Sequence, residues 1–150
     1  MSEVKKVAYI CVLKYLNSMA RIFSMSDAAS IAIHSMVLIA RAENGINAVN
    51  IAEMTGFSKN HISKVLQRLV KYDLLNSVRG PSGGFTLKKS ATEITLLTIY
   101  EAIEGSLDVR DCPMSREICR FDQCVMGNVI NKMTLEFQKF LGDQTLKAYI

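Results

Sequence analysis

The 150-residue sequence predicts a mainly helical fold with one small β-hairpin and a long C-terminal helix. Between residues 26 and 71, apolar residues recur at the 3.6-residue spacing of helices. Between residues 74 and 89, two short strand-like runs flank a turn rich in glycine. From residue 124 onward, apolar residues alternate in steps of four and three, which is typical of a helix with a continuous seam. A chain of this length can bury a core without disulfide bonds.

The first predicted helix begins at Ser26 or Asp27, either of which can cap it, and its apolar stripe runs to Ala40. Gly45 is expected to end it as a left-handed cap. Residues 1–19 do not follow the pattern of the rest and form an N-terminal extension. Because Met19 is a second possible start, the extension is a misassigned leader, a cloning remnant or a native extra helix.

Two short helices are expected next, joined by a turn around Gly56. Asn47 can cap the first helix and Ser58 the second. The second carries a regular apolar set (Ile62, Val65, Leu66, Leu69 and Val70). Two short helices with a glycine-containing turn, the second more basic, form a helix-turn-helix arrangement.

The opposite face of this second helix carries donors and acceptors suited to phosphates and to base edges in a major groove. Its members are Ser58, Lys59, Asn60, His61, Ser63, Lys64, Gln67, Arg68 and Lys71. Seven basic residues and one acidic residue give the stretch 58–89 a net charge of +6, whereas residues 90–111 carry −4. This concentration of positive charge favours a nucleic-acid surface over a merely solvated face.

The predicted hairpin, residues 74–80 and 85–89, follows that helix directly and therefore forms a wing. Arg79 lies near its tip, where a guanidinium can enter an adjacent minor groove. Thr95 is expected to cap a further helix, residues 96–104, which Gly105 ends. These elements predict a winged helix-turn-helix domain over residues 20–90, a linking helix and cysteine loop over 91–124, and a dimerisation helix with a tail over 125–150.

The last helix is expected to begin at Cys124 and to form a seam of Met126, Ile130, Met133, Phe137 and Phe140. Such a seam either joins two subunits or packs on its own domain. We favour a homodimer, because a two-fold protein suits a palindromic site on double-stranded DNA.

Three cysteines, Cys112, Cys119 and Cys124, fall within thirteen polar, loop-like residues where no core requires them. Their clustering indicates a metal or cluster site or redox chemistry. Zinc is the weaker alternative, because close Cys-x-x-Cys pairs are missing. No apolar run reaches the length of a membrane span, so a cytoplasmic protein without membrane association is expected. No catalytic constellation can be assembled, and an enzyme is not expected.

The order of motifs resembles the winged-helix iron–sulfur transcriptional regulators of the family that includes IscR and NsrR. The matching segments are IAEMTGFS (51–58), VRGPSGGF (78–85), EITLL (93–97) and AIEG (102–105), followed by the three cysteines. The resemblance implies a homodimeric, sequence-specific regulator controlled by a 2Fe–2S cluster, which senses redox state, nitric oxide or iron–sulfur status. It also implies three cysteine ligands and a fourth, non-cysteine ligand. The cysteine spacings, six and four residues, differ slightly from the five and five of the best-known members.

The resemblance leaves two patterns for the fourth ligand. In the IscR-like pattern a histidine follows the last cysteine after two residues, but that position is Gly127 here. In the NsrR-like pattern an aspartate near the start of the first helix reaches across from the partner subunit, and Asp27 matches it. His34 is a weaker candidate, seven residues further along the same face. The alternatives are that Asp27 is only a helix cap and that His34 is a partly buried packing residue.

Two other functions remain open at this point. One is a winged-helix regulator with zinc or a thiol switch in place of the cluster. The other is a protein-interaction module that does not bind DNA, since a fold does not define a function.

Overall fold

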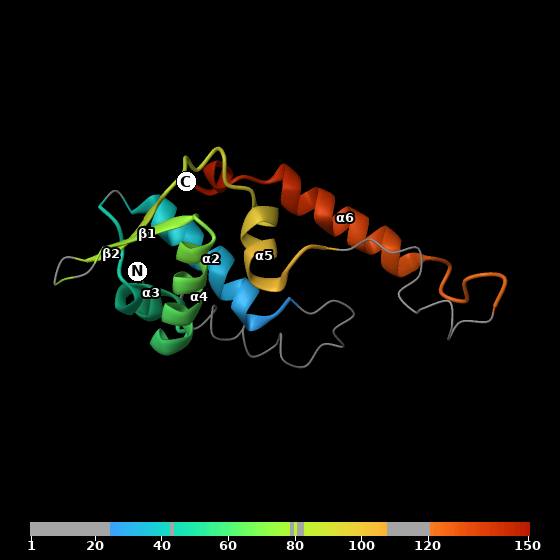
Figure 1. The fold of residues 1–150 in the computed structure, drawn as a ribbon, viewed down its shortest axis with the longest axis horizontal. Helices are drawn as coiled ribbons and strands as arrows, with labels where there is room; N and C mark the ends of the chain where they lie inside the picture. Colours follow the sequence, from blue (N-terminus) through green and yellow to red (C-terminus); the bar gives the residue numbers. More distant parts are fainter. Residues whose placement is uncertain (1–24, 43, 79, 81–82, 108–120) are drawn as a thin grey trace, which may run out of the picture.

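A central helix, α2 (Asp27–Arg41), organises the fold (Figure 1). The computed structural model describes residues 25–42, 44–78, 80, 83–107 and 121–150. Helix α2 contacts helices α3 (Ala48–Thr55), α4 (Lys59–Lys71) and α5 (Leu96–Glu104), strand β2 (Gly84–Leu87) and the 3₁₀ helix η1 (Leu146–Tyr149). Because neighbours cover it on several sides, α2 buries residues around much of its circumference (Ala29, Ile31, Ala32, Ser35, Met36 and Ile39). The predicted mainly helical fold with one hairpin is confirmed.

Three predicted helix caps are confirmed. Ser26 Oγ accepts a hydrogen bond from the Ala29 N–H at 3.0 Å and caps α2. Asn47 Oδ1 accepts from the Asn50 N–H at 2.9 Å and caps α3. Thr95 Oγ1 accepts from the Thr98 N–H at 3.1 Å and caps α5. Each bond satisfies one of the backbone donors that a helix leaves free at its first turn.

The hairpin pairs β1 (Leu75–Val78) with β2 in antiparallel register, with Leu75 opposite Leu87. It is anchored to the loop between α2 and α3 by Ile46, which exchanges two backbone hydrogen bonds of 3.2 and 2.9 Å with Phe85. The chains approach so closely that a Cβ on Gly84 would lie 2.9 Å from the Ile46 carbonyl carbon. Glycine at this position therefore serves strand packing and not only the turn.

The prediction that Gly45 caps α2 is wrong. Helix α2 ends at Arg41, and Gly45 lies further on, immediately before the Ile46 bridge. Its φ of +80° suits glycine, and a Cβ there would lie 2.8 Å from Thr86 Cγ2. The glycine is thus needed where the loop meets the hairpin.

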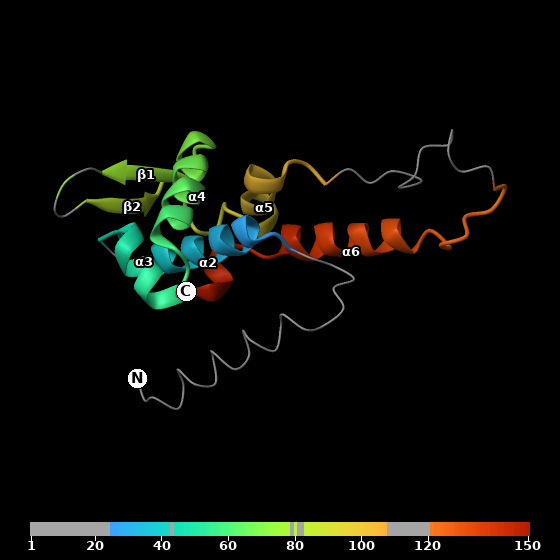
Figure 2. The same cartoon turned by 90° about the horizontal axis from the view of Figure 1, so that it is seen from below.

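Helix α6 (Val129–Asp143) extends away from the hairpin end of the molecule (Figures 1 and 2). It starts five residues later than predicted from Cys124, because Gly127 and Asn128 both have a left-handed φ of 58°, which a right-handed helix cannot contain. The helix packs on α5, where the rings of Phe137 and Tyr100 meet edge to face with centroids 5.4 Å apart.

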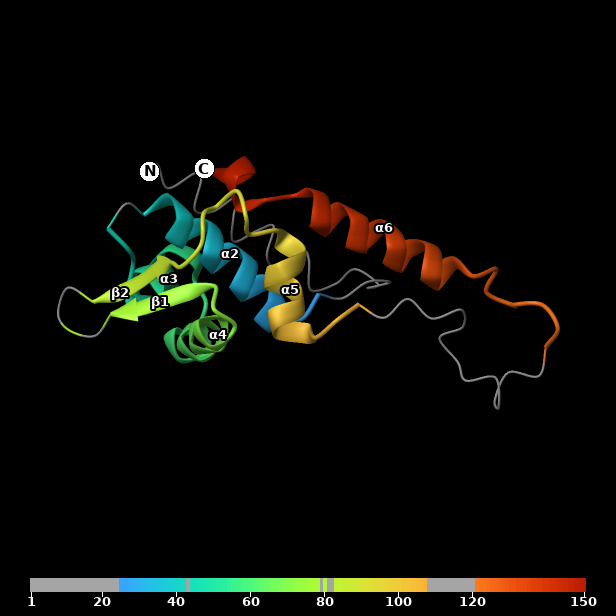
Figure 3. The ribbon, with the colours of Figure 1, turned by 45° about the horizontal axis from the view of Figure 1, so that its top comes forward.

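After α6 the chain returns to the helical core, which the sequence analysis did not anticipate. The Leu96 N–H donates to the Gln144 carbonyl at 2.9 Å, and the Leu146 N–H donates to the Ile94 carbonyl at 3.0 Å. Leu146 is fully buried. Figure 3 shows this tail beside α2 and above α5. None of the helices in the described segments is long and apolar enough to span a membrane.

Candidate functional site

The turn between α3 and α4 has the geometry of a helix-turn-helix. Gly56 adopts a left-handed φ of 77°, and its N–H donates to the Ala52 carbonyl at 2.8 Å. Thr55 Oγ1 donates to the Ile51 carbonyl at 2.7 Å. These bonds end α3 sharply and allow α4 to start three residues later, after Ser58.

Helix α4 is strongly two-sided. Its buried face consists of Ile62, Val65, Leu66 and Leu69, as the periodicity predicted, whereas Val70 of the same predicted set is half-buried. Its other face holds the predicted contact residues: Ser58, Lys59, Asn60, His61, Lys64, Arg68 and Lys71 are exposed, and Ser63 is half-buried.

The positive charge of α4 is not neutralised within the described part of the chain. The helix contains no acidic residue, and none of its four cations forms a salt bridge there. Ser58 occupies the cap position, but its side chain makes no capping hydrogen bond. The N-terminus of α4 therefore presents backbone N–H groups and positive charge together, an arrangement that attracts anions.

The acidic residue of this basic region, Asp73, is paired elsewhere. Its carboxylate accepts a hydrogen bond from Lys88 Nζ at 2.6 Å, between the end of α4 and the end of β2. This hydrogen bond and the charge of Lys88 hold the pKa of Asp73 below its usual value. Asp73 thus counters a cation of the hairpin and not the contact face of α4.

The hairpin tip is described in part. The Gly83 N–H donates to the Gly80 carbonyl at 2.9 Å, which closes the turn. Val78, at the end of β1, is exposed. Arg79 lies outside the described residues, so its predicted role stays a prediction.

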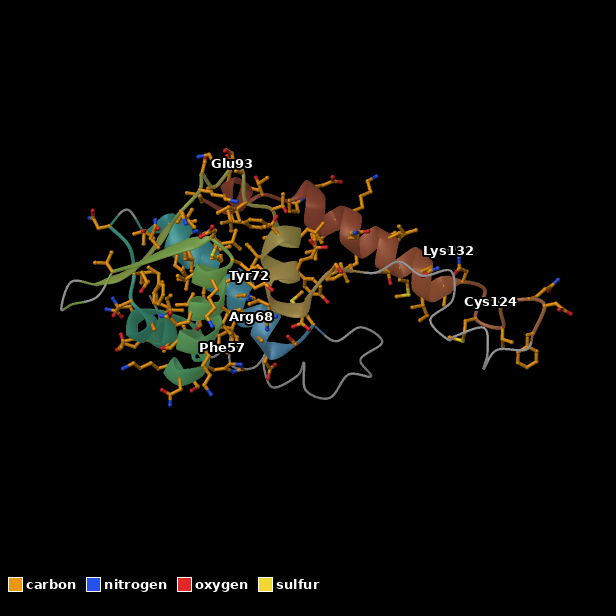
Figure 4. All side chains as sticks on the ribbon, viewed as in Figure 1. Phe57, Arg68, Tyr72, Glu93, Cys124 and Lys132 are labelled. Atoms are coloured by element: carbon orange, nitrogen blue, oxygen red, sulfur yellow. The ribbon has the colours of Figure 1, made fainter. Side chains whose placement is uncertain are left out.

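Two of the three clustered cysteines, Cys112 and Cys119, also lie outside the described residues. Cys124 is exposed, and its Sγ accepts a hydrogen bond from the Asn128 N–H at 3.4 Å. The Cys124 carbonyl accepts from the Gly127 N–H at 2.9 Å. Cys124 therefore lies in a tight turn just before α6, at the end of the molecule remote from the hairpin (Figure 4).

Asp27 does not cap α2, although that interpretation was open from the sequence. Ser26 Oγ accepts from the Ala29 N–H and also donates to Glu104 Oε1 at the end of α5. Asp27 is the first residue of α2, and it is exposed. Its carboxylate is thus not committed to the cap, and it lies where a helix N-terminus favours negative charge.

His34 is exposed, and not partly buried as its packing interpretation predicted. Its Nδ1 lies 2.7 Å from the Ser30 carbonyl, to which it can donate a hydrogen bond. The ring meets Phe57 edge-on, with centroids 6.5 Å apart. This places His34 toward the turn after α3, whereas Asp27 lies near the end of α5.

Within one chain, Cys124 and Asp27 are not brought together. Cys124 lies in the turn that precedes α6 (Figure 4), whereas α2 begins beside the end of α5 (Figure 1). The described segments contain no group of three or more His, Cys, Asp or Glu side chains that could hold a metal ion.

Sequence reasoning missed a groove between the start of α2, α5 and α6. Its volume is about 420 Å³, and Met25, Tyr100, Leu107, Met133, Thr134, Glu136 and Phe137 line it. Burial, together with the charge of Glu104, raises the pKa of Tyr100. The apolar spacing of residues 96–104 was visible in the sequence, but the approach of α6 to that helix was not.

Comparison with known proteins gives consistent matches. Residues 25–150 match the family model of Rrf2, described as an iron-dependent transcriptional regulator. The HTH-type transcriptional regulator IscR of Pectobacterium carotovorum subsp. carotovorum (strain PC1) is 30% identical over 129 residues, which are 85% of this chain and 74% of the relative. The HTH-type transcriptional regulator NsrR of Oceanobacillus iheyensis is 32% identical over 106 residues, which are 69% of this chain and 72% of the relative.

Solved structures share the fold. The global cysteine regulator CymR of B. subtilis superposes with a TM-score of 0.70 at 19% identity, covering 84% of this chain and 95% of CymR. IscR of T. potens superposes with a TM-score of 0.68 at 25% identity, covering 86% of this chain and 87% of that protein.

Proposed function

Because the chain belongs to the Rrf2 family, whose members are DNA-binding transcriptional regulators and not enzymes, we propose that it acts as a homodimer whose DNA binding is controlled by a 2Fe–2S cluster. The observation that carries the cluster proposal is the capping of α2 by Ser26, which leaves the exposed Asp27 carboxylate available as a ligand. The sensed signal is redox state, nitric oxide or iron–sulfur status.

Helix α4 is the proposed recognition helix. Lys59, Asn60, Ser63 and Lys64 read bases near its start, because the first turns of a recognition helix enter the major groove. Ser58 and His61 contribute further polar contacts, and Arg68 and Lys71 bind phosphates. The exposure of this face and its unpaired positive charge support these roles.

The hairpin is the proposed wing, with Arg79 entering the minor groove. Its anchoring through Ile46 and Phe85 supports this role, since a wing needs a defined direction relative to the recognition helix. The turn between Gly80 and Gly83 leaves the tip free of bulky side chains at these two positions.

The homodimer is proposed to form through residues 125–150, which would place two recognition domains (residues 20–90) on a palindromic operator. Of the predicted seam, Phe137 packs on Tyr100 of its own chain. Other apolar residues along and before α6 are exposed by 41–76%: Val125, Met126, Val129, Leu135 and Phe140. Exposed apolar residues in such number favour a protein interface.

Cys112, Cys119 and Cys124 of one subunit and Asp27 of the partner subunit are the proposed cluster ligands. The donor set fits an iron–sulfur cluster, because thiolates are the usual protein ligands of such clusters. A carboxylate oxygen exchanges more readily than a thiolate, which suits a cluster that acts as a sensor. Within one chain, Cys124 before α6 is separated from the start of α2, where Asp27 lies, which supports the assignment of Asp27 to the partner (Figures 1 and 4). The backbone at residue 127 has a φ of 58°, a left-handed conformation that favours glycine over the histidine of the IscR-like pattern.

A packed route joins the proposed cluster segment to the recognition helix. Residues 105–124 connect α5 to α6, and α5 contacts α2, α4 and α6. A change in how the cysteine segment is held is therefore transmitted through α5 to α4, and alters the spacing of the two recognition helices.

Anaerobic purification followed by visible spectroscopy and iron and sulfide analysis tests this proposal. Wild-type protein should be coloured and should contain iron and sulfide in equal amounts, and Asp27→Ala should change the spectrum. A colourless, iron-free preparation from cells with intact cluster assembly would contradict the cluster. One zinc per chain without sulfide would indicate the zinc alternative instead.

A further inference from the structure

We propose that Ser26 and Glu104 act as a positioning pair, which holds the first turn of α2 on the end of α5 and so directs Asp27 toward the cluster of the partner subunit. This inference rests on the proposed function, because it assumes that Asp27 is a cluster ligand. It assigns a role to two residues that are not ligands themselves.

The hydroxyl group of Ser26 both accepts and donates a hydrogen bond. Its Oγ accepts from the Ala29 N–H at 3.0 Å and donates to Glu104 Oε1. With φ and ψ of −63° and 155°, its backbone is extended, and α2 starts at the next residue. The direction of the Asp27 side chain is therefore defined by a residue that is tied to α5.

Glu104 is unusual for the helix that carries it. A carboxylate in the last turn of α5 faces the negative end of that helix dipole, which is unfavourable. At the start of α2, the same carboxylate meets the positive end of another helix dipole and the hydroxyl group of Ser26. Glu104 thus supplies negative charge at the N-terminus of α2, and Asp27 is not required there.

The pair also joins the two parts of the chain that contribute ligands. Gly105 ends α5 with a φ of 90°, and its N–H donates to the Glu101 carbonyl at 3.0 Å. From there the sequence leads directly to Cys112. The end of α5 precedes the cysteines that bind the cluster of the same subunit, and the first turn of α2 offers the Asp27 carboxylate to the cluster of the partner subunit. The hydrogen bond between Ser26 and Glu104 therefore connects these two segments.

Variants of the pair in the full-length, anaerobically loaded homodimer test the proposal. Ser26→Ala and Glu104→Ala each remove the hydrogen bond between the two residues. For Glu104→Ala we expect iron loss to a chelator to accelerate roughly fivefold, the factor for losing one typical hydrogen bond, and the visible circular dichroism to shift toward that of Asp27→Ala. Ser26→Ala also loses the bond from the Ala29 N–H and should accelerate iron loss at least as much. Ser26→Thr keeps the hydroxyl group and should restore wild-type behaviour. Glu53→Ala, which removes an exposed carboxylate from α3, is the matched control and should leave both readouts unchanged.

The double variant separates positioning from a general effect on the fold. If the pair acts through Asp27, adding Glu104→Ala to Asp27→Ala should change neither the spectrum nor the rate of iron loss. An equal acceleration in both backgrounds, or a wild-type spectrum and rate in Glu104→Ala, would overturn the proposal. Thermal unfolding of the iron-free variants checks folding. If Glu104→Ala unfolds, Glu104→Gln replaces it, because its neutral amide accepts a weaker hydrogen bond from Ser26 than the carboxylate does. Its spectrum and rate of iron loss should then lie between those of wild type and Asp27→Ala, and wild-type values would refute the idea. Wild-type protein that holds no cluster would refute the proposed function and this inference together.

Discussion

Replacing Gly84 by alanine should destabilise the protein and misplace the hairpin. The new Cβ would lie 2.9 Å from both the carbonyl carbon and oxygen of Ile46, and 3.3 Å from the Asn47 nitrogen. All three are backbone atoms, which cannot rotate away as a flexible side chain can. Overpacking of this kind costs about 1–3 kcal/mol. Weakening the two bonds between Ile46 and Phe85 adds about 0.5–1.5 kcal/mol for each bond that is lost.

Urea unfolding measures the change in the free energy of unfolding, and thermal unfolding measures the change in melting temperature, each followed by far-ultraviolet circular dichroism. A loss of about 2–3 kcal/mol should lower the melting temperature by roughly 4–12 °C for a chain of this size. The matched control is Gly142→Ala, whose Cβ would meet only Leu97 Cδ2 at 3.7 Å, an ordinary contact. Because Gly142 lies within α6, alanine there should instead stabilise the protein by about 0.5–1 kcal/mol. A Gly84→Ala variant as stable as wild type would refute the argument from close backbone approach.

Four further changes test other parts of the structure. Ser35→Ala should raise the free energy of unfolding by about 1 kcal/mol, because the buried hydroxyl group has no hydrogen-bond partner among the described residues; a loss of stability in urea would contradict this. Asp73 has a folded pKa below its usual value of 3.8, so its stabilising contribution is present above that value and is lost as the pH falls through the folded pKa; an NMR titration should show this pKa rising in Lys88→Gln, and an unchanged value would rule out the pairing. Arg68→Ala should weaken DNA binding and reduce the slope of log affinity against log salt by about 0.9 if it binds one phosphate; equal slopes would exclude such a contact. Phe140→Glu should yield monomers in sedimentation experiments with unchanged helix content, since Phe140 is 56% exposed on α6; a persisting dimer would argue against this interface.

Helix α4 shows which features of the structure nearby residues in the sequence can predict. Four of its five predicted apolar residues are buried, and the fifth, Val70, is half-buried. The residues between them predicted the exposed basic face, of which Ser63 is half-buried. Both follow from a period of 3.6 within one helix, which needs no knowledge of the neighbours. Asn47 and Thr95 were also predictable, since a cap acts within one turn of the residue that makes it.

Other features depended on residues far apart in the chain. Gly45 was mistaken for a cap because its real role is set by Thr86 in the hairpin. The start of α6 was placed too early, since the seam runs through Met126 although the left-handed Asn128 interrupts the helix. The return of Leu146 into the core had no signal in its local sequence.

The candidate cluster site combines both kinds of information. The clustering of the cysteines, the basic helix and the wing motif are local patterns, and they were sufficient to predict the winged helix and its family. Sequence left Ser26 and Asp27 as equal candidates for capping α2, because both types of side chain can accept the same backbone hydrogen bond. Packing resolved that choice through Glu104, 78 residues away in the chain, whose carboxylate receives the Ser26 hydroxyl group once α5 lies against α2. A contact between residues so far apart in the sequence forms only when the core is assembled. With Ser26 as the cap, Asp27 stays exposed at the start of α2.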